Sequence, residues 1–306
     1  MTDKNDWEFV HSVASEAEWK PGLRKIFDYR DLGIRDGTGG DFIAHVIRRN
    51  DTKGTDGVQS WHVHDCQFQM VYVLNGWATF EYDGLVWPLP QTGQMWLEYE
   101  LLTRPSSKGF FCVSTSYRQE PNAIPGRHDT IFPMFEFEMP GDVNDLKAME
   151  YELCEYLGFD PLTEKTYAEW QAHYGVSQMV EMDAQHELAM DANFGSCLIT
   201  DFPEITSPFW NMARNNDGNT AKKMDVILGG METIGSAERS CDVDMMRDTF
   251  HSITDGAYSK LLFELFGKDR VEAELEKFLE FDFFQRVGGG IGITRMIPAL
   301  EKINKI

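Results

Sequence analysis

The segment VSTSYRQEPNAIPGRHDTIFPMFEFEM, residues 113–139, carries charged side chains of both signs on and between two predicted strands. Its ends, VSTSYR and FPMFEFEM, are short runs rich in β-branched and aromatic residues, which predicts antiparallel strands. Side chains on one face of such a pair converge, so we expect Arg118, Glu120 and Arg127 to share a site. Two arginines there favour a phosphate ester, because guanidinium groups bind anionic oxygens in pairs.

The second strand of this pair continues with an aromatic side chain and two carboxylates. Phe132 could offer a flat face to a planar base, and Glu136 and Glu138 share a strand face where they could bind an ammonium group. Each feature also has a structural interpretation. An Arg-x-Glu pair on a strand is usually an exposed ion pair of little energetic value, and Phe132 alone is more often a core residue.

Two later segments add carboxylates, glycines and a third arginine. In MDVILGGMETIGSAERS, residues 224–240, Asp225 and Glu232 near a phosphate site favour Mg²⁺, which usually bridges carboxylates and substrate phosphates. In RVGGGIGITRM, residues 286–296, the glycines allow the backbone to approach a ligand closely. Arg295 then falls in the first turn of a predicted helix.

Composition limits the classes of partner. The chain of 306 residues has 42% apolar residues, enough for a substantial core, and a formal net charge of −22. This charge disfavours a nucleic-acid partner, which usually requires concentrated Lys and Arg, although acidic surfaces also serve solubility. No apolar run could span a bilayer and the amino-terminal residues are polar, so we expect a cytoplasmic protein without membrane contact.

The hydrophobic pattern changes near residue 87. Before it, short alternating runs such as FIAHVIRR and WATFEYDG predict antiparallel strands, and after it strands alternate with helices. Residues 141–158, 256–267 and 269–280 have helical spacing of apolar residues. We expect an α+β protein in two parts: a small all-β segment over residues 1–87 and a larger domain, over residues 88–306, whose antiparallel sheet is flanked by helices.

The larger part resembles the catalytic domain of class II aminoacyl-tRNA synthetases, in the aspartyl/asparaginyl branch, and its relative, ammonia-dependent asparagine synthetase. YRQE…RHDTIFPMFEFEM is similar to motif 2 and GGGIGITRM to motif 3. PLPQTGQMWLE resembles the amino-acid-binding segment before motif 2, and TDFPEITSPFWNMARNNDGNTAKKMDVILGGMETIGSAERS also follows that branch. The blocks occur in family order, which is more specific than any single block.

The resemblance implies an ATP site with bound Mg²⁺. Arg118 would hold the α-phosphate and stabilise the charge that develops there, and Arg295 would bind the γ-phosphate. Asp225 and Glu232 would position Mg²⁺·ATP. The remaining ATP-site residues that it implies, which orient the adenine and the distal phosphates, are Glu120, Arg127, His128, Phe132 and Gly292.

It also implies an amino-acid pocket. Gln94 and Glu136 would hold the α-amino end of the substrate, with Ser236 in the same pocket. Arg239 stands where this branch pairs an arginine with the substrate's side-chain carboxylate or amide. Leu97 occupies a place where aspartyl enzymes carry lysine, which makes the pocket more similar to the asparaginyl type.

The amino-terminal part contains GVQSWHVHDCQFQMVYVLNG, residues 57–76, which resembles the first motif of the cupin β-barrels. His62, His64 and Gln69 would then be ligands of Zn²⁺, Fe²⁺ or Mn²⁺. Gln69 replaces the usual glutamate and the second cupin motif is absent, so a barrel without metal is favoured over a working metal site. Motif 1 of the synthetases, which builds their dimer interface, is also not visible, although a homodimer is still expected.

These features predict an ATP-dependent ligase that activates an aspartate-like carboxylate as an acyl-adenylate and passes it to a nitrogen nucleophile. Its small-molecule substrates would be an amino acid and ATP. The alternatives are an aspartyl- or asparaginyl-tRNA ligase, which the acidic charge disfavours, and a metal-dependent cupin enzyme coupled to the synthetase-like domain in natural-product biosynthesis. A pseudoenzyme that senses aspartate or ATP is a further alternative.

Overall fold

The computed structural model describes residues 7–21, 26–50, 80–82, 85–87, 90–118 and 124–305. The chain divides into two compact units, Met1–Gly76 and Trp77–Ile306. Among the described residues, no helix is both long and apolar enough to cross a membrane.

The first unit contains a small antiparallel sheet in which the middle strand pairs with both others. Trp19 packs against the guanidinium groups of Arg48 and Arg30, whose carbons lie 4.1 and 5.9 Å from its ring centroid. The described elements are β1 (Lys20–Pro21), β2 (Phe27–Asp31), α1 (Ile34–Gly37) and β3 (His45–Arg49).

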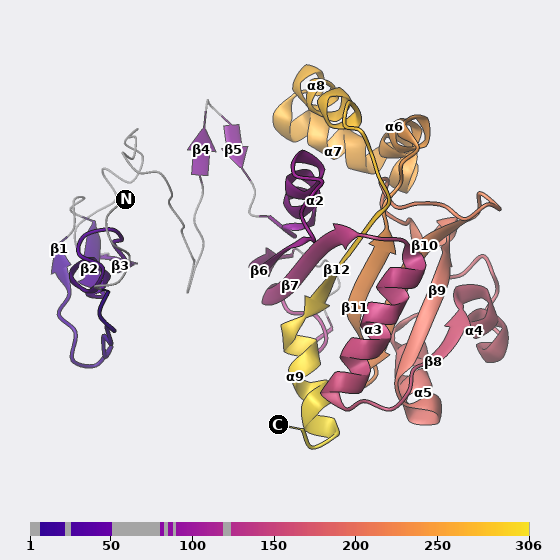
Figure 1. The fold of residues 1–306 in the computed structure, drawn as a ribbon, viewed down its shortest axis with the longest axis horizontal. Coiled ribbons are helices and arrows are strands. Elements are labelled where there is room, and N and C mark those ends of the chain that lie inside the picture. Colours follow the sequence, from indigo (N-terminus) through magenta and orange to yellow (C-terminus); the bar gives the residue numbers. More distant parts are fainter. Residues whose placement is uncertain are drawn as a thin grey trace. The chain divides into compact units, whose positions relative to one another are not determined.

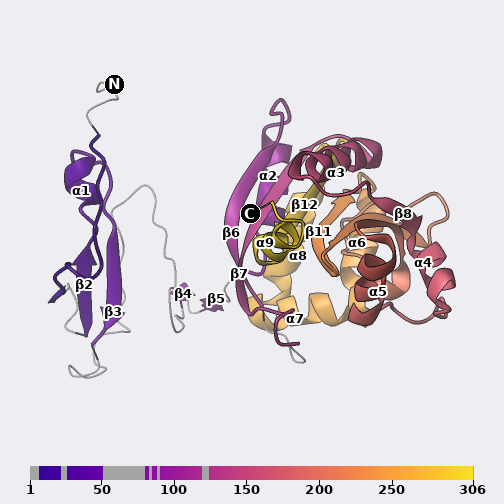
Figure 2. The ribbon, with the colours of Figure 1, turned by 90° about the horizontal axis from the view of Figure 1, so that it is seen from below.

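A seven-stranded sheet forms the centre of the second unit (Figures 1 and 2), with strands in the order β6 (Phe110–Tyr117), β7 (Ile131–Pro140), β12 (Arg286–Gly292), β11 (Met231–Glu238), β10 (Thr220–Leu228), β9 (Cys197–Pro203) and β8 (Thr163–Thr166). All neighbours are antiparallel except β8 and β9, which are parallel. A separate hairpin pairs β4 (Phe80–Tyr82) with β5 (Leu85–Trp87). This helix-flanked sheet confirms the predicted α+β class, with one parallel pair that the sequence did not indicate.

One face of the sheet is covered by α3 (Val143–Leu157) and α9 (Ile293–Lys302), which pack into the main hydrophobic core. Figure 1 shows α3 lying in front of the central strands of the sheet. The predicted helix over residues 141–158 is confirmed as α3. Asp142 precedes its first residue and accepts from the backbone amides of Asn144 and Asp145, and the helix ends before Gly158, whose φ is 89°.

Five further helices form two smaller cores. One of them packs Trp170 and Met190 against β9 through the helices α4 (Tyr167–Tyr174) and α5 (Ala184–Phe194). The other surrounds the buried Trp210 with α6 (Val243–Ser252), α7 (Ala257–Phe266) and α8 (Lys268–Leu279), the last two of which were predicted. A further helix, α2 (Gln94–Thr103), contacts β7, β6 and β12.

Helix α2 is joined to the sheet by a completely buried ion pair. Arg286 on β12 donates from Nε and Nη2 to Oε1 of Glu98, at 2.9 and 2.6 Å, and both side chains have no exposed surface. The other carboxylate oxygen accepts from the side-chain amide of Asn211 at 2.6 Å. Breaking such a pair leaves one charge buried without a counter-ion, which is far more unfavourable than never having made the pair.

A second buried carboxyl lies between α3 and the sheet. Glu150 has no exposed surface, and its Oε1 accepts from the hydroxyl of Ser236 on β11 at 2.5 Å. Burial raises the pKa of Glu150 from 4.5 to about 8, the hydrogen bond from Ser236 opposes the rise, and the charge of Asp225 adds to it. Glu150 therefore retains its proton at neutral pH in the folded chain.

The Glu98–Arg286 pair predicts a large loss of stability on removal of one partner. Glu98→Ala should lower the free energy of unfolding by about 3–5 kcal/mol, since Arg286 is left unpaired in the interior. Urea denaturation checks this, with Glu264→Ala as the control, because Glu264 pairs at 4.0 Å with Lys260 on an exposed helix surface. The control should change stability by less than about 1 kcal/mol. Equal effects in the two variants would contradict the role of the buried pair.

The raised pKa of Glu150 predicts a pH-dependent stability. The folded chain keeps this proton to about pH 8, whereas the carboxyl of the unfolded chain loses it near pH 4.5. The contribution of Glu150 to the free energy of unfolding is therefore complete below pH 4.5 and is lost as the pH rises to about 8. Glu150→Gln has nearly the same shape and no charge. It should be more stable than the unsubstituted chain at pH 8.5, by roughly 3–5 kcal/mol, and similar to it at pH 5. Thermal melts across this range test the prediction, and a constant difference at all pH values would refute it.

Candidate active site

An open cleft of about 520 Å³, including the space at its mouth, lies on the sheet face opposite the main hydrophobic core, with the first turn of α9 at its edge. Strand alternation places it there: Met134 and Gly290 face the cleft, whereas the adjacent Phe135 and Ile291 pack in the core. Its lining residues are Arg118, Arg127, His128, Asp129, Phe132, Met134, Glu232, Thr233, Gly235, Gly290, Gly292, Thr294 and Arg295.

The cleft brings together most of the residues that the sequence implied for ATP. Of the nine implied residues, Glu120 lies outside the described residues and Asp225 lies behind the lining, next to Gly235. The other seven line the cleft and come from the segment that joins β6 to β7, from β7, β11 and the end of β12, and from the start of α9: Arg118, Arg127, His128, Phe132, Glu232, Gly292 and Arg295.

Arg118 and Phe132 are in contact at the cleft. Arg118 directly follows β6 and is exposed, and its guanidinium carbon lies 5.2 Å from the centroid of the Phe132 ring. The half-buried ring belongs to β7, opposite Ser116 of β6. A cation over an aromatic face is an attractive contact that holds both groups at the edge of the cleft.

Arg127 is held by a residue that the sequence analysis did not predict. Its Nη2 donates to Oε2 of Glu187 on α5 at 2.5 Å, and its Nη1 donates to the carbonyl oxygen of Gly230 at 3.1 Å. The same Oε2 accepts from the backbone N–H of Glu232 at 2.8 Å, and Arg295 donates to the carbonyl oxygen of Glu232 at 2.7 Å. Glu187 is 60 residues from Arg127 in sequence, and no spacing pattern links the two.

Asp225 lies behind the lining of the cleft, next to Glu232, which is part of that lining. A Cβ atom added at Gly235 would lie 2.7 Å from Oε1 of Glu232 and 3.4 Å from Oδ1 of Asp225. Asp225 is buried; its Oδ2 accepts from Lys223 Nζ at 2.5 Å, and its Oδ1 accepts no hydrogen bond from the described residues. Burial raises the pKa of Asp225 to about 7. The nearby ammonium group of Lys223 opposes this rise, and the negative charge of Glu232 adds to it.

This carboxylate pair fits Mg²⁺ better than a metal with an all-protein shell. An unpartnered, buried carboxylate oxygen beside a second carboxylate suits Mg²⁺, which takes one or two carboxylates and completes its shell with phosphate oxygens and water. Within the described part of the chain, no three His, Cys, Asp or Glu side chains cluster as a metal site.

Three of the four residues implied for amino-acid binding, Gln94, Glu136 and Arg239, lie in a largely buried polar cluster around Glu138. Arg239 donates from Nε and Nη2 to Oε1 of Glu138, at 2.9 and 2.6 Å, and Gln94 donates to the same oxygen at 2.7 Å. The other oxygen of Glu138 accepts no hydrogen bond from the described residues. The guanidinium group implied to recognise the substrate is therefore already paired with a carboxylate of this chain.

Glu136 lies one pleat along β7 from Glu138 and is also buried. Its carboxylate accepts from the backbone N–H of Gly93 at 2.9 Å, from the Ser114 hydroxyl at 2.5 Å and from the Thr92 hydroxyl. The segment that begins α2 thus covers both carboxylates, because Gln94 reaches Glu138 while its two predecessors reach Glu136.

The glycine run of β12 provides space for side chains of the neighbouring strand. A Cβ atom at Gly288 would lie 2.2 Å from Cδ of Glu138, and one at Gly290 would lie 2.5 Å from Cε of Met134. The sequence suggested that these glycines admit a ligand. The structure adds that they admit the Glu138 carboxylate, which no larger residue at Gly288 would allow.

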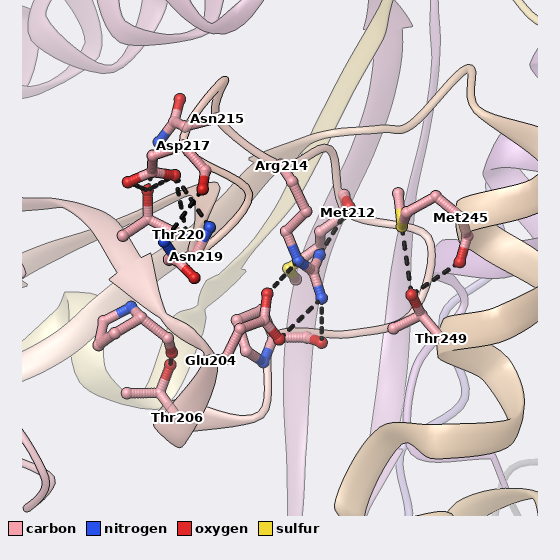
Figure 3. A network of polar contacts seen from close by, with 12 residues as sticks. Glu204, Thr206, Met212, Arg214, Asn215, Asp217, Asn219, Thr220, Met245 and Thr249 are labelled. Carbon is pink, nitrogen blue, oxygen red and sulfur yellow. Dashed lines mark hydrogen bonds and ion pairs between the residues drawn. The ribbon is translucent and has the colours of Figure 1, made fainter.

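A braced loop runs beside Arg239. Residues 204–219 connect β9 to β10, and Arg214 holds the loop by donating to the carboxylate of Glu204 and, at 2.7 Å, to the carbonyl oxygen of Met212 (Figure 3). Met212 forms an antiparallel bridge with Arg239. The backbone that carries Arg239 is therefore paired on the loop side as well as within the sheet.

One residue implied for the amino-acid pocket lies apart from these groups. Ser236 lies on the α3 side of the sheet, where it bonds to Glu150, because strand alternation turns Gly235 rather than Ser236 toward the cleft. The structure therefore separates Ser236 from Gln94, Glu136 and Arg239. The possible cupin ligands His62, His64 and Gln69 lie outside the described residues.

Comparison with known proteins places most of the chain in one family. The family model described as "tRNA synthetases class II (D, K and N)" matches residues 67–306, so the match begins before the boundary expected at residue 88. An asparagine–tRNA ligase of Rhodopirellula baltica is 27% identical over 110 residues, which are 35% of this chain and 22% of that protein.

Solved structures of similar fold point the same way. The asparaginyl-tRNA synthetase from Pyrococcus horikoshii complexed with asparaginyl-adenylate matches with a TM-score of 0.59 and 19% identity, over 74% of this chain and 56% of that one. The Entamoeba histolytica asparaginyl-tRNA synthetase matches with a TM-score of 0.58 and 17% identity, over 73% and 55%. The chain thus spans about half the length of these structures, and at such identities the likeness concerns the fold. On the family match, the chain belongs to the class II tRNA synthetases of the D, K and N group.

Proposed function

We propose that this chain is an ATP-dependent ligase that activates the carboxylate of an aspartate-like amino acid as an acyl-adenylate and transfers it to a nitrogen nucleophile. The observation that carries this proposal is the cleft of about 520 Å³, which gathers seven of the nine residues implied for ATP from distant segments. Family membership supports it, and one similar structure holds asparaginyl-adenylate.

The proposed reaction has two steps. A carboxylate oxygen of the amino acid attacks the α-phosphorus of ATP, the bond to pyrophosphate breaks, and the acyl-adenylate forms. The nitrogen nucleophile then attacks the carbonyl carbon, and AMP leaves. Negative charge develops on the α-phosphate oxygens in the first step, and Arg118 at the cleft edge is placed to stabilise it.

The distal phosphates would meet the other two arginines. Arg127 and Arg295 line the same cleft, and both are held at the backbone of Glu232, directly or through Glu187. Asp225 and Glu232 would hold Mg²⁺, which offsets phosphate charge when bound. Among the described residues that line the cleft, Phe132 offers a phenylalanine ring for stacking on adenine.

The amino acid would bind at the buried cluster around Arg239. Arg239 and Glu138 together carry no net charge, so the pair presents both donors and an acceptor rather than an unpaired cation. Leu97, buried in α2, adds no charge. This environment favours a carboxamide at least as much as a carboxylate, in agreement with an asparaginyl-type pocket.

A tRNA acceptor is the second candidate. Sequence similarity to an asparagine–tRNA ligase favours it, whereas the net charge of −22 disfavours polynucleotide binding. ATP–pyrophosphate exchange without tRNA, over a panel of amino acids, tests adenylation first. Adding tRNA then distinguishes a charging enzyme from an amide ligase. A cupin-coupled reaction stays a prediction of the sequence, since its residues lie outside those described.

Arg118→Ala should slow aspartate- or asparagine-dependent exchange by about 100-fold or more, because it removes charge stabilisation worth roughly 3 kcal/mol. The fold should remain intact, since Arg118 is exposed. Arg104→Ala is the matched control: Arg104 directly follows α2, is exposed like Arg118, and pairs with the less exposed Glu100 at 2.9 Å. An unchanged rate for Arg118→Ala would refute the assignment of this arginine to the α-phosphate.

Arg239→Leu should raise the KM for the amino acid by about 100-fold, with little change in the KM for ATP. Because this substitution also leaves Glu138 unpaired in the interior, Arg239→Lys is measured beside it, and thermal melts check that both variants fold. Arg239→Lys keeps the charge and should have an intermediate KM. If both variants fold and retain the original KM, the substrate does not bind at Arg239.

A further inference from the structure

Glu187 occupies a central place behind the candidate ATP site. It lies in the first turn of α5, and its side chain is 21% exposed. One atom, Oε2, accepts both from Nη2 of Arg127 and from the backbone N–H of Glu232. Glu187 itself does not line the cleft, so any influence on a ligand there would act through these two residues.

Arg127 depends on this contact for its position. It belongs to the segment between β6 and β7 rather than to a strand, and yet its side chain is only 12% exposed. Its two terminal nitrogens are fixed by Glu187 and by the carbonyl oxygen of Gly230. A free arginine side chain carries about 2 kcal/mol of rotamer entropy, part of which is lost when a ligand fixes it. When the side chain is already held in place, much of this cost no longer falls on ligand binding.

The contact between Glu187 and Glu232 links Glu187 to Arg295 as well. The N–H of Glu232 bonds to Glu187 and its carbonyl oxygen accepts from Arg295. One carboxylate on α5 therefore connects both arginines that would meet the distal phosphates, together with a carboxylate that would face Mg²⁺.

We infer that Glu187 is a positioning residue that holds Arg127 and Glu232 in the arrangement that binds the distal phosphates of ATP. This inference rests on the proposed function, since it takes the cleft to be the ATP site. It adds that nucleotide affinity depends on α5, a helix whose residues do not line the cleft.

The chain offers a matched control on the same helix. Asp191 lies one turn beyond Glu187, has a similarly covered side chain at 14% exposure, and pairs with Lys302 of α9. Like Glu187, Asp191 joins α5 to a neighbouring element. Its partner in that contact, Lys302, is not a residue assigned to the ATP site. If Glu187 merely anchored the helix, loss of either carboxylate would have the same consequences.

The experiment compares Glu187→Ala, Glu187→Gln and Asp191→Ala in the full chain. KM for ATP and kcat are measured by pyrophosphate exchange at saturating amino acid, and the increase in Tm on adding Mg²⁺·ATP is measured independently of turnover. Glu187→Ala should raise the KM for ATP about tenfold and reduce the ATP-dependent rise in Tm. Glu187→Gln should stay within about threefold of the unsubstituted chain, because the amide oxygen can accept from the same two donors.

Asp191→Ala should keep the original KM even if its Tm without ATP falls as far as that of Glu187→Ala. A KM for Glu187→Ala equal to that of Asp191→Ala would overturn the inference. A lower KM in Glu187→Ala or Glu187→Gln would also overturn it, because Glu187 would then compete with phosphate for Arg127. An unsubstituted chain that gains no stability from ATP would contradict the proposed function itself, and the inference with it.

Discussion

Two buried arginine–glutamate pairs constrain the arrangement of the second unit, Trp77–Ile306. Arg286 with Glu98 and Arg239 with Glu138 lie on the same face of the sheet, each with hydrogen bonds of 2.6–2.9 Å and almost no exposure. Because an unpaired charge in the interior is strongly unfavourable, neither pair can separate without loss of stability. Together they determine where α2 lies and why residue 288 is glycine.

Strand alternation gives the two faces of the sheet different environments, a hydrophobic core on one side and a charged cleft on the other. Odd and even positions of β7, β11 and β12 point in turn to the hydrophobic core and to the cleft. The core face is covered by α3 and α9, and burial raises the pKa of one of its buried carboxyls, Glu150, to about 8. The other face collects the arginines and carboxylates, where they can bind a polyanionic ligand. Glu187 on α5 accepts hydrogen bonds from two residues of that face, Arg127 and Glu232, without lining the cleft itself.

Much of this could be predicted from the sequence, where the residues occur in short, ordered blocks. Arg118, Phe132 and Arg295 were predicted to share a site and do line one cleft. Ser236 and Glu187 show where sequence reasoning ends. Ser236 sits in a predicted block, but the register of β11 turns it toward Glu150, and sequence proximity does not specify the face. Glu187 meets Arg127 only through folding, so no local pattern could reveal the contact.

The central claim is that this chain forms an acyl-adenylate. The most direct measurement supplies ATP, Mg²⁺, hydroxylamine as acceptor, and aspartate or asparagine labelled with oxygen-18 in its carboxylates. Mass spectrometry then follows the label. If a carboxylate oxygen attacks the α-phosphorus and the carbonyl carbon later accepts the nitrogen, the released AMP must carry one labelled oxygen. Unlabelled AMP, or ADP together with labelled inorganic phosphate, would contradict adenylate formation.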